Sequence, residues 1–343
     1  MRDPFLTIAI PTFNRCEYLA EQLDRLISQI GKRNDIEILV CDNASQDRTR
    51  EIVINRENEI QNLRYFCQER NMGLDKNVYT AYEMSRGLYV WFLTDDDYVT
   101  ADAISLLENV LKENNPQVLV MGSRQLEDSF VIDPLHENVS FTDWSFPCSA
   151  NHFMAVIMLA RLILKKEEID LRSIMSLPGT VFPQVTLALE VLKKRFSFMV
   201  RNSVIITRNP GFIFNNFFDL YLLGVRRAIR YSSWEEAEGI LIPAMEGNLN
   251  DFVRLEIEER LGCYHSRKGL PFGSWVEGWK EYGSNWRSRS KLLLILFISI
   301  IPPKLFRFSF YIYILFRRKS FRIARRELHE HDRCKNVIRI SDV

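Results

Sequence analysis

The cysteines of this 343-residue chain show none of the spacings that build a disulfide framework or a zinc site. No two of them form a C-x-x-C pair, and the six are scattered along the sequence: Cys16, Cys41, Cys67, Cys148, Cys263 and Cys334. Such spacing argues against a fold held together by disulfide bonds or by a zinc ion. We expect free thiols in a reducing compartment.

The chain also lacks a hydrophobic run long enough to cross a bilayer as a helix, which takes ~20 apolar residues. The run at 292–301 has ten residues, is interrupted by Ser299, and is followed by Pro302 and Pro303, which break a helix. The apolar run at the N-terminus is too short for a signal peptide, and no small-residue cleavage site follows it. We therefore expect the body of the protein to be cytoplasmic.

Acidic residues are missing from 287–326, where eleven residues are basic. Positions 1–286, by contrast, carry 31 basic and 40 acidic residues, so the formal net charge of +1 hides an asymmetry. The basic segment also contains two short apolar runs, 292–301 and 305–316. This combination is typical of elements that lie in the plane of an anionic membrane surface, here the inner face of the cell membrane. The alternative is a pair of core helices with a solvated basic end.

Glycine is absent from the turn after the first expected strand, which reads Pro11-Thr12-Phe13-Asn14-Arg15. Dinucleotide-binding and P-loop motifs need glycines there, because the backbone must approach the phosphates closely. The turn therefore disfavours nicotinamide-dependent enzymes and P-loop nucleotidases. It is also compatible with an ordinary turn in which Asn14 caps the following helix.

Short β-rich runs alternate with segments of helical periodicity over the first 121 residues. This alternation predicts an α/β fold with a mostly parallel sheet covered on both faces. The expected strands are 6–10, 36–41, 63–67, 88–93 and 118–121, and the expected helices are 17–30, 47–54, 75–85 and 101–113. Ligands of such sheets bind beyond the carboxyl ends of the strands.

Residues 122–215 have a less regular pattern. We expect helices at 153–168 and 184–194 and a strand at 203–207. Residues 216–286 read as mainly helical, so the sheet-forming half of the chain is followed by a helical C-terminal region.

Three adjacent carboxylates follow the expected strand at 88–93, in the segment Thr94-Asp95-Asp96-Asp97. Carboxylates this close repel one another unless they are solvated or neutralised by a cation. Hard oxygen ligands suit Mg²⁺ or Mn²⁺, and such an ion can bridge two phosphates. The alternative is an acidic turn that caps the next helix.

Two further segments follow expected strands. Asp42 and Asn43 come directly after the strand at 36–41, where a carboxylate can accept a hydrogen bond from a nucleobase. Asn71, Gly73 and Asn77 form a glycine-containing turn that enters a helix. Each segment is also compatible with a plain helix cap or turn.

Together, and in this order, the four segments resemble glycosyltransferase family 2, whose members have the GT-A fold. Members show P-T/x-x-N-R, D-N-x-S-x-D, N-x-G-x-x-x-N and L-D-x-D-D at these strand ends. The resemblance covers roughly residues 5–122. It looks closest to O-antigen sugar transferases of the abequosyltransferase type, which share G-x-D-x-N (Gly73, Asp75, Asn77) and G-T-x-x-P (here 179–183).

The resemblance implies a role for each matching position. A nucleotide-sugar donor would be bound by Pro11, Thr12, Asn14, Arg15, Asp42, Asn43, Asn71, Gly73, Asn77 and Asp95. Within this set Asp42 would read the base, and Asp95 would touch the ribose or pyrophosphate. Asp96 would ligate Mn²⁺ or Mg²⁺, with Asp97 in support.

Two departures from the family pattern concern chemistry. Thr94 replaces the first carboxylate of L-D-x-D-D, so the ribose contact would move to Asp95. Inverting members usually carry a catalytic carboxylate in an E-D pair about ninety residues further on, where this chain has Pro183-Gln184. Glutamine cannot take a proton. Asp170 is our candidate for the catalytic base, and a plain surface residue near a helix end is the alternative.

The resemblance implies a hexosyl or deoxyhexosyl transferase that moves a sugar from a nucleotide sugar to a saccharide hydroxyl. The acceptor would be lipid-linked, in surface-polysaccharide assembly; no nucleic-acid partner is indicated. The expected parts are a nucleotide-sugar-binding half (1–122), an acceptor-side half (123–215), a helical region (216–286) and membrane-associated helices with a tail (287–343). The alternatives are a non-catalytic nucleotide-sugar-binding or scaffold protein and a sugar nucleotidyltransferase.

Overall fold

The structure is a computed structural model in two compact units. It describes residues 3–57, 60–125, 138–144, 152–180, 182–207, 223–247, 276, 279 and 286–300. The first unit comprises Met1–Phe212 and Gly224–Leu241, and the second comprises Ile213–Leu223 and Ile242–Val343. The four parts expected from the sequence stay predictions. Among the described cysteines, Cys16, Cys41 and Cys67 are free thiols, as expected.

One mixed sheet of nine strands forms the centre of the first unit, counted over the described residues. Its order is β3-β2-β1-β4-β8-β6-β9-β5, with β7 paired to β9. The strands are β1 Leu6–Thr12, β2 Ile36–Asp42, β3 Leu63–Cys67, β4 Tyr89–Phe92, β5 Tyr98–Val99, β6 Val118–Gln125, β7 Val139–Phe141, β8 Leu162–Lys165 and β9 Phe198–Thr207. The four strands from β3 to β4 are parallel, which confirms the predicted α/β architecture.

Helices follow most of the strands, close to the positions expected from the sequence. In the first unit they are α1 Cys16–Ile30, α2 Thr49–Glu57, α3 Leu74–Met84, α4 Ala103–Asn114, α6 Leu171–Met175, α7 Pro183–Lys194, α8 Val225–Tyr231 and the start of α9 Glu235–Gly247. In the second unit, α12 spans Trp286–Ile300. The apolar run expected at 305–316 lies outside the described residues.

The helix expected at 153–168 is wrong. Two short 3₁₀ turns, Met154–Ile157 and Leu159–Arg161, lead instead into β8. The strand lies between β4 and β6 and is antiparallel to both. Its residues Leu162, Ile163 and Leu164 are buried on both faces, and such a short continuous apolar run suits an inner strand as well as a helix.

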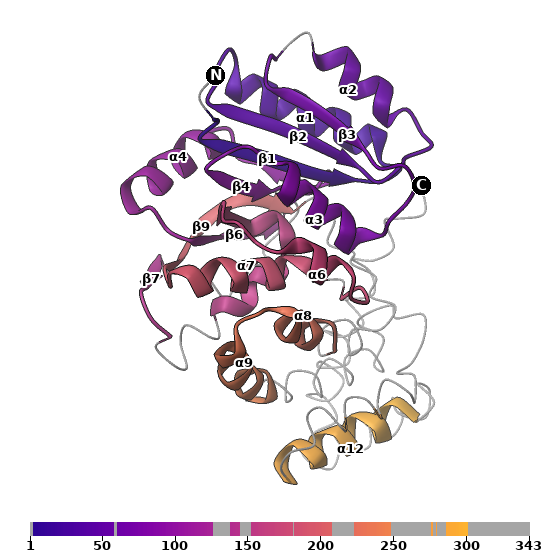
Figure 1. Ribbon diagram of the computed structural model, residues 1–343, viewed down its shortest axis with the longest axis vertical. Helices are drawn as coiled ribbons and strands as arrows, with labels where there is room; N and C mark the ends of the chain where they lie inside the picture. Colours follow the sequence, from indigo (N-terminus) through magenta and orange to yellow (C-terminus); the bar gives the residue numbers. More distant parts are fainter. Residues whose placement is uncertain are drawn as a thin grey trace, which may run out of the picture. The chain divides into compact units, whose positions relative to one another are not determined.

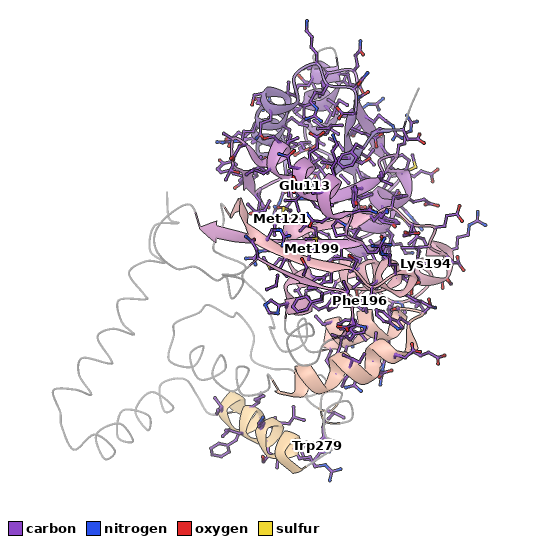
Figure 2. All side chains as sticks on the ribbon, turned by 90° about the vertical axis from the view of Figure 1, so that its left-hand side faces the viewer. Glu113, Met121, Lys194, Phe196, Met199 and Trp279 are labelled. Carbon is purple, nitrogen blue, oxygen red and sulfur yellow. The ribbon has the colours of Figure 1, made fainter. Side chains whose placement is uncertain are left out.

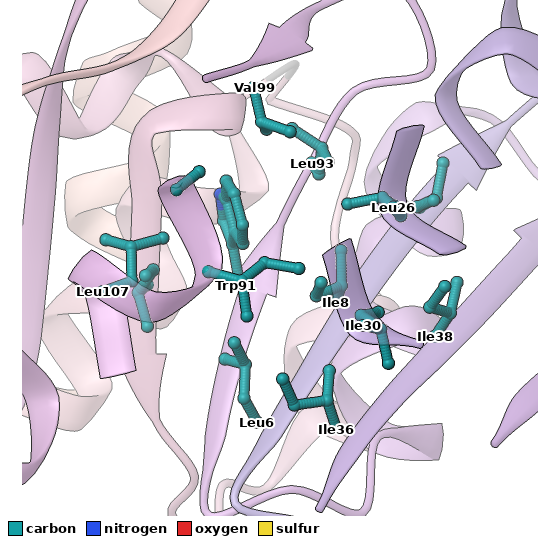
Figure 3. Close-up of a cluster of buried hydrophobic side chains, with 14 of the residues drawn as sticks. Leu6, Ile8, Leu26, Ile30, Ile36, Ile38, Trp91, Leu93, Val99 and Leu107 are labelled. Carbon is teal, nitrogen blue, oxygen red and sulfur yellow. The ribbon is translucent and has the colours of Figure 1, made fainter. Parts of the chain in front are cut away.

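The hydrophobic core between the sheet and α1, α2 and α4 determines which side chains of β1 face these helices. Leu6, Ile8 and Ile10 of β1 alternate with Thr7 and Ala9, and only the first three belong to this core. Figure 3 shows Ile8 beside Trp91 of β4, with Leu107 of α4 and Ile38 of β2 on either side. Burying each large apolar side chain contributes ~1.5–3 kcal/mol, so a register slip of one residue would cost several such terms.

Helices α3 and α7 cover the opposite face of the sheet (Figure 1). Every residue of α7 from Pro183 to Leu192 is buried, because α8 packs on its outer side. Phe196, which follows α7 and is labelled in Figure 2, contacts Trp144 and Trp234 with ring centroids 4.7 and 6.3 Å away. Helix α7 as a whole is therefore held between the sheet, α3 and α8.

A close backbone approach at Gly87 provides a test of this packing. A Cβ there would lie 2.4 Å from the Thr7 backbone nitrogen and 2.8 Å from the Leu6 carbonyl carbon. We expect Gly87→Ala to lower the free energy of unfolding by ~2–3 kcal/mol, because backbone atoms of β1 must move. Urea unfolding followed by circular dichroism measures it.

The matched control is Gly239→Ala in the middle of α9, where an added Cβ has no atom within 4 Å. This change should raise the free energy of unfolding by ~0.5–1 kcal/mol, because alanine favours the helix. Equal losses in the two variants would contradict the packing described for β1.

Candidate active site

A hydrogen bond joins the ends of the neighbouring strands β1 and β4. The Thr12 hydroxyl at the end of β1 donates to Asp95 Oδ2 over 2.7 Å. Both side chains are buried, and Asp95 is only 6% exposed. The first carboxylate after β4 therefore faces the end of β1.

Arg15 neutralises two of the three clustered carboxylates. Its Nη1 donates to Asp95 Oδ1 over 3.0 Å and to Asp96 Oδ2 over 2.6 Å. The Arg15 side chain is 46% exposed, so one end of this ion pair is open to solvent while Asp95 is not. A cation thus already occupies the space between the two carboxylates.

The pKa values of this group reflect the balance of burial and charge. Burial raises the pKa of Asp95, and the Thr12 hydroxyl and Arg15 only partly oppose it. Burial alone would lower the pKa of Arg15, but the charges of Asp95 and Asp96 outweigh it and raise that pKa. The site therefore favours a bound cation while it penalises an unpaired carboxylate.

Asp42 lies beside Thr12 in the register of β1 and β2 and is almost fully buried. Its Oδ1 accepts the Ser45 backbone N–H over 2.9 Å, and its Oδ2 accepts the Tyr65 hydroxyl over 2.5 Å. The Cys67 thiol makes a third, long contact to Oδ2 over 3.9 Å. A carboxylate has about four acceptor positions, so these three donors leave capacity for the N–H of a base. Tyr65, from β3, was not recognised from the sequence; the pairing of β2 with β3 is the signal that brings it here.

Asparagines connect the loop after β2 to the turn before α3. Asn43 Nδ2 donates to Asn71 Oδ1 over 2.8 Å, and the same oxygen accepts the Gly73 N–H over 2.9 Å. Gly73 has a φ of +85°, which favours glycine. Asn77 is buried and donates to the Cys41 carbonyl over 2.9 Å. Asn77 therefore holds α3 against β2, while Asn43 and Asn71 shape the loops at the carboxyl end of β2 and before α3.

The loops after β1 and β2 are also joined to each other. Asn14 has a φ of +54°, and its Oδ1 accepts the Gln46 N–H over 2.7 Å. Asn14 does not cap α1, contrary to one interpretation of the sequence. Asp47 from the neighbouring loop does so, because its Oδ2 accepts the Cys16 N–H over 2.9 Å. Pro11 stands in β1 opposite Cys41.

While Arg15 lies on Asp95 and Asp96, a divalent ion fits this site only with help from a ligand. Over the residues that the structure describes, no three His, Cys, Asp or Glu side chains are placed to hold a metal. Asp96 offers a partly exposed carboxylate, whereas Asp97 Oδ2 accepts the Thr94 hydroxyl over 3.0 Å within its own turn. Mg²⁺ is commonly held by one or two carboxylates plus substrate phosphates, which is the arrangement that Asp96 suits.

Asp170, the candidate base, is exposed and precedes α6. Its Oδ2 accepts the Ser173 hydroxyl over 3.1 Å, and its described bonds are all local. Its catalytic role stays a prediction. Gln184 is buried in the first turn of α7 and donates to the Ile157 carbonyl.

The chain is similar to known sugar transferases in sequence and in fold. The sequence pattern of glycosyl transferase family 2 matches residues 7–165. The abequosyltransferase RfbV of Salmonella typhimurium is 29% identical over 201 residues, 54% of this chain and 60% of the relative. A Campylobacter jejuni GalNAc(5)-diNAcBac-PP-undecaprenol β-1,3-glucosyltransferase is 32% identical over 125 residues, 36% of this chain and 39% of the relative. The chain thus spans less than two thirds of either relative.

Through residues 7–165, which are 159 of its 343 residues, the chain is similar to glycosyltransferase family 2. Its fold is similar to the crystal structure of residues 1–349 of Staphylococcus aureus TarS in complex with UDP-GlcNAc. The TM-score is 0.61 at 15% identity, and the match covers 92% of both chains. This likeness confirms the predicted GT-A fold.

Removal of the Arg15 charge tests whether the carboxylate pair needs a cation. We expect Arg15→Gln to lower the free energy of unfolding by ~1 kcal/mol in chelator, because a half-exposed pair contributes modestly. Mn²⁺ should then stabilise the variant more than the parent, since the ion replaces the lost charge. Thermal unfolding with chelator and with Mn²⁺ measures both effects.

Arg50→Gln is the matched control, because Arg50 is an exposed arginine of α2. Its response to Mn²⁺ should equal that of the parent. A cation site at Asp95 and Asp96 would be contradicted if Mn²⁺ stabilised the Arg15 and Arg50 variants equally.

Proposed function

We propose that this protein transfers a sugar from a nucleotide-sugar donor to a hydroxyl of a lipid-linked saccharide. The observation that carries the proposal is the group formed by Thr12, Arg15, Asp95 and Asp96 beside Asp42 at one edge of the sheet. The group combines a buried acceptor for a base N–H with a charged cluster for a diphosphate. Both lie beyond the carboxyl ends of parallel strands.

Each residue has a definite task in this proposal. Asp42 accepts a hydrogen bond from the base and is kept in place by Tyr65 and Ser45. Asp95 accepts from the ribose side, and Arg15 is exposed enough to turn toward a phosphate. Asp96 would hold Mn²⁺ or Mg²⁺, with Asp97 beside it in the turn; the bound ion supplies charge neutralisation on the leaving diphosphate.

The proposed acceptor class draws on two kinds of support. One relative is named as a transferase to a saccharide on diphospho-undecaprenol, and another as an abequosyltransferase. The second kind of support is the basic, apolar segment 287–326, which suits a peripheral position at the inner face of a membrane. A lipid-linked acceptor would be presented at such a surface.

Helix α12 provides the described part of that segment. Its residues Leu292, Ile295 and Ile298 are buried, whereas Phe297 is 65% exposed. Arg289 is exposed on the same helix. Over the described residues, no helix has the length and apolar character to span a membrane. A helix with exposed apolar and basic side chains suits contact with the headgroup region.

Substitution of Asp96 tests the donor proposal. We expect Asp96→Asn to lower metal-dependent turnover of the donor by at least ~10²-fold, because a neutral amide is a poor ligand for a hard cation. UDP-, CDP- and GDP-sugars, incubated with Mn²⁺ and a lipid-linked oligosaccharide extract, provide the assay. Thermal shift with the same nucleotides identifies the donor first.

Glu113→Gln, an exposed change in α4, is the control and should keep the parent's turnover. Retained turnover in Asp96→Asn would refute the metal role. A parent protein that binds a nucleoside diphosphate but turns over no donor would instead be a non-catalytic binding protein. Synthesis of a nucleotide sugar from a sugar phosphate would mark a nucleotidyltransferase.

Vesicle flotation tests the membrane proposal with the full chain. We expect binding to vesicles that contain anionic phosphatidylglycerol and little binding to phosphatidylcholine alone. Phe297→Ser should weaken it about tenfold, because a buried aromatic ring contributes ~1.5–3 kcal/mol. Leu106→Ser, which removes an exposed apolar side chain of α4, should have no effect. Equal loss in the two variants would contradict the role of α12.

A further inference from the structure

The first turn of α7 contains no group that can accept a proton from an acceptor hydroxyl. Pro183 and Gln184 stand there, and the Gln184 amide is buried and donates to the Ile157 carbonyl. Glu190, the one acidic residue of α7, accepts the Ser233 N–H and, over 2.8 Å, the Ser233 hydroxyl. Its carboxylate is therefore used to join α7 to the segment between α8 and α9.

A carboxylate from another element reaches the residues just before α7. Asp75, in the first turn of α3, accepts the Thr180 backbone N–H over 2.5 Å and the Thr180 hydroxyl over 2.9 Å. Its carboxyl atoms lie 3.7 Å from the point where a Cβ of Gly179 would stand. The two short motifs around Asp75 and Thr180, 105 residues apart in the sequence, are thus in direct contact.

Asp75 also lines a pocket of about 120 Å³. Gly73 and Tyr79 contribute to one wall, and Gly179 and Tyr231 contribute to the others. One water molecule occupies ~30 Å³ in liquid water, so the pocket can hold a few water molecules or the hydroxyl-bearing edge of a sugar ring. The lining of the pocket is mostly apolar, and the Asp75 carboxylate is a polar group in it that can accept a hydrogen bond from a hydroxyl group.

A short series of hydrogen bonds connects the pocket to the proposed donor site at the carboxyl ends of β1, β2 and β4. Asn71 and Gly73, which precede α3, are bound to Asn43, the residue after Asp42. Asn77 holds the next turn of α3 on β2. The turn that shapes the nucleotide side therefore also delivers Asp75 to the start of α7.

We infer that Asp75 is the catalytic base of the proposed sugar transfer. This inference rests on the proposed function. The acceptor hydroxyl gives its proton to the Asp75 carboxylate while its oxygen forms a bond to the anomeric carbon of the donor. The bond from that carbon to the diphosphate oxygen breaks, and its electron pair leaves with the nucleoside diphosphate. Thr180 holds the carboxylate in place.

The other titratable groups of the pocket are poor alternatives. They are Lys76 and Tyr79 of α3 and Tyr231 at the end of α8, and the segment 174–179 adds none. Burial raises the pKa of Tyr79, and the charges of Asp75 and Tyr231 add to the rise. A tyrosine with a raised pKa stays protonated at neutral pH, so Tyr79 cannot take a proton there.

The test compares Asp75→Asn with the parent in transfer from UDP-, CDP- or GDP-sugars to the lipid-linked extract. We expect kcat to fall by ~10²–10⁴-fold, the range that general bases supply. The donor KM and the affinity for UDP, CDP or GDP with Mn²⁺ should change less than about threefold. Glu83→Gln, an exposed change on the same helix, should leave kcat unaltered.

Thr180→Val keeps the Asp75 carboxylate and removes one donor to its charged form. That bond helps to hold the carboxylate in place, so its loss should lower kcat by about tenfold while the donor KM changes less than about threefold. An unchanged kcat in Thr180→Val, or an Asp75→Asn variant that transfers sugar like the parent, would overturn the inference. A parent that transfers no sugar at all would instead refute the proposed function, and the inference with it.

Discussion

The hydrogen bond between Thr12 and the buried carboxylate of Asp95 determines the geometry of the donor edge. Burial of Asp95 costs free energy unless a donor and a cation satisfy it, and Thr12 and Arg15 supply both. Because β1 and β4 are adjacent and parallel, the bond ties the ends of two strands together. Arg15 and Asp96 extend this ion pair to the surface, where a diphosphate could replace one partner.

Loops, more than strands, connect this edge to the rest of the molecule. The segment after β2 holds Asp42 inward through Ser45 and Tyr65, caps α1 through Asp47, and reaches α3 through Asn43 and Asn71. Helix α3 then contacts the start of α7 through Asp75 and Thr180. Hydrogen bonds thus connect the proposed nucleotide side to the proposed acceptor side, although the two are far apart in the sequence.

The sequence predicted the parts of this site that depend on strand ends, because parallel strands bring their carboxyl ends to one edge. Thr12, Asp42 and Asp95 could be grouped on that basis. Periodicity misassigned β8, since Leu162, Ile163 and Leu164 are buried on both faces and an inner strand then looks like a helix. The contact between Asp75 and Thr180 depends on how α3 packs near α7, which no spacing in the sequence encodes.

A crystal structure with Mn²⁺ and the nucleoside diphosphate that stabilises the protein would show whether Asp96 and the diphosphate hold the ion together. We expect an anomalous manganese peak within ligand distance of Asp96 and the diphosphate, with the base against Asp42 and the Arg15 guanidinium moved from between Asp95 and Asp96. A diphosphate bound away from the ends of β1 and β4, or manganese elsewhere with Arg15 still on both carboxylates, would contradict it.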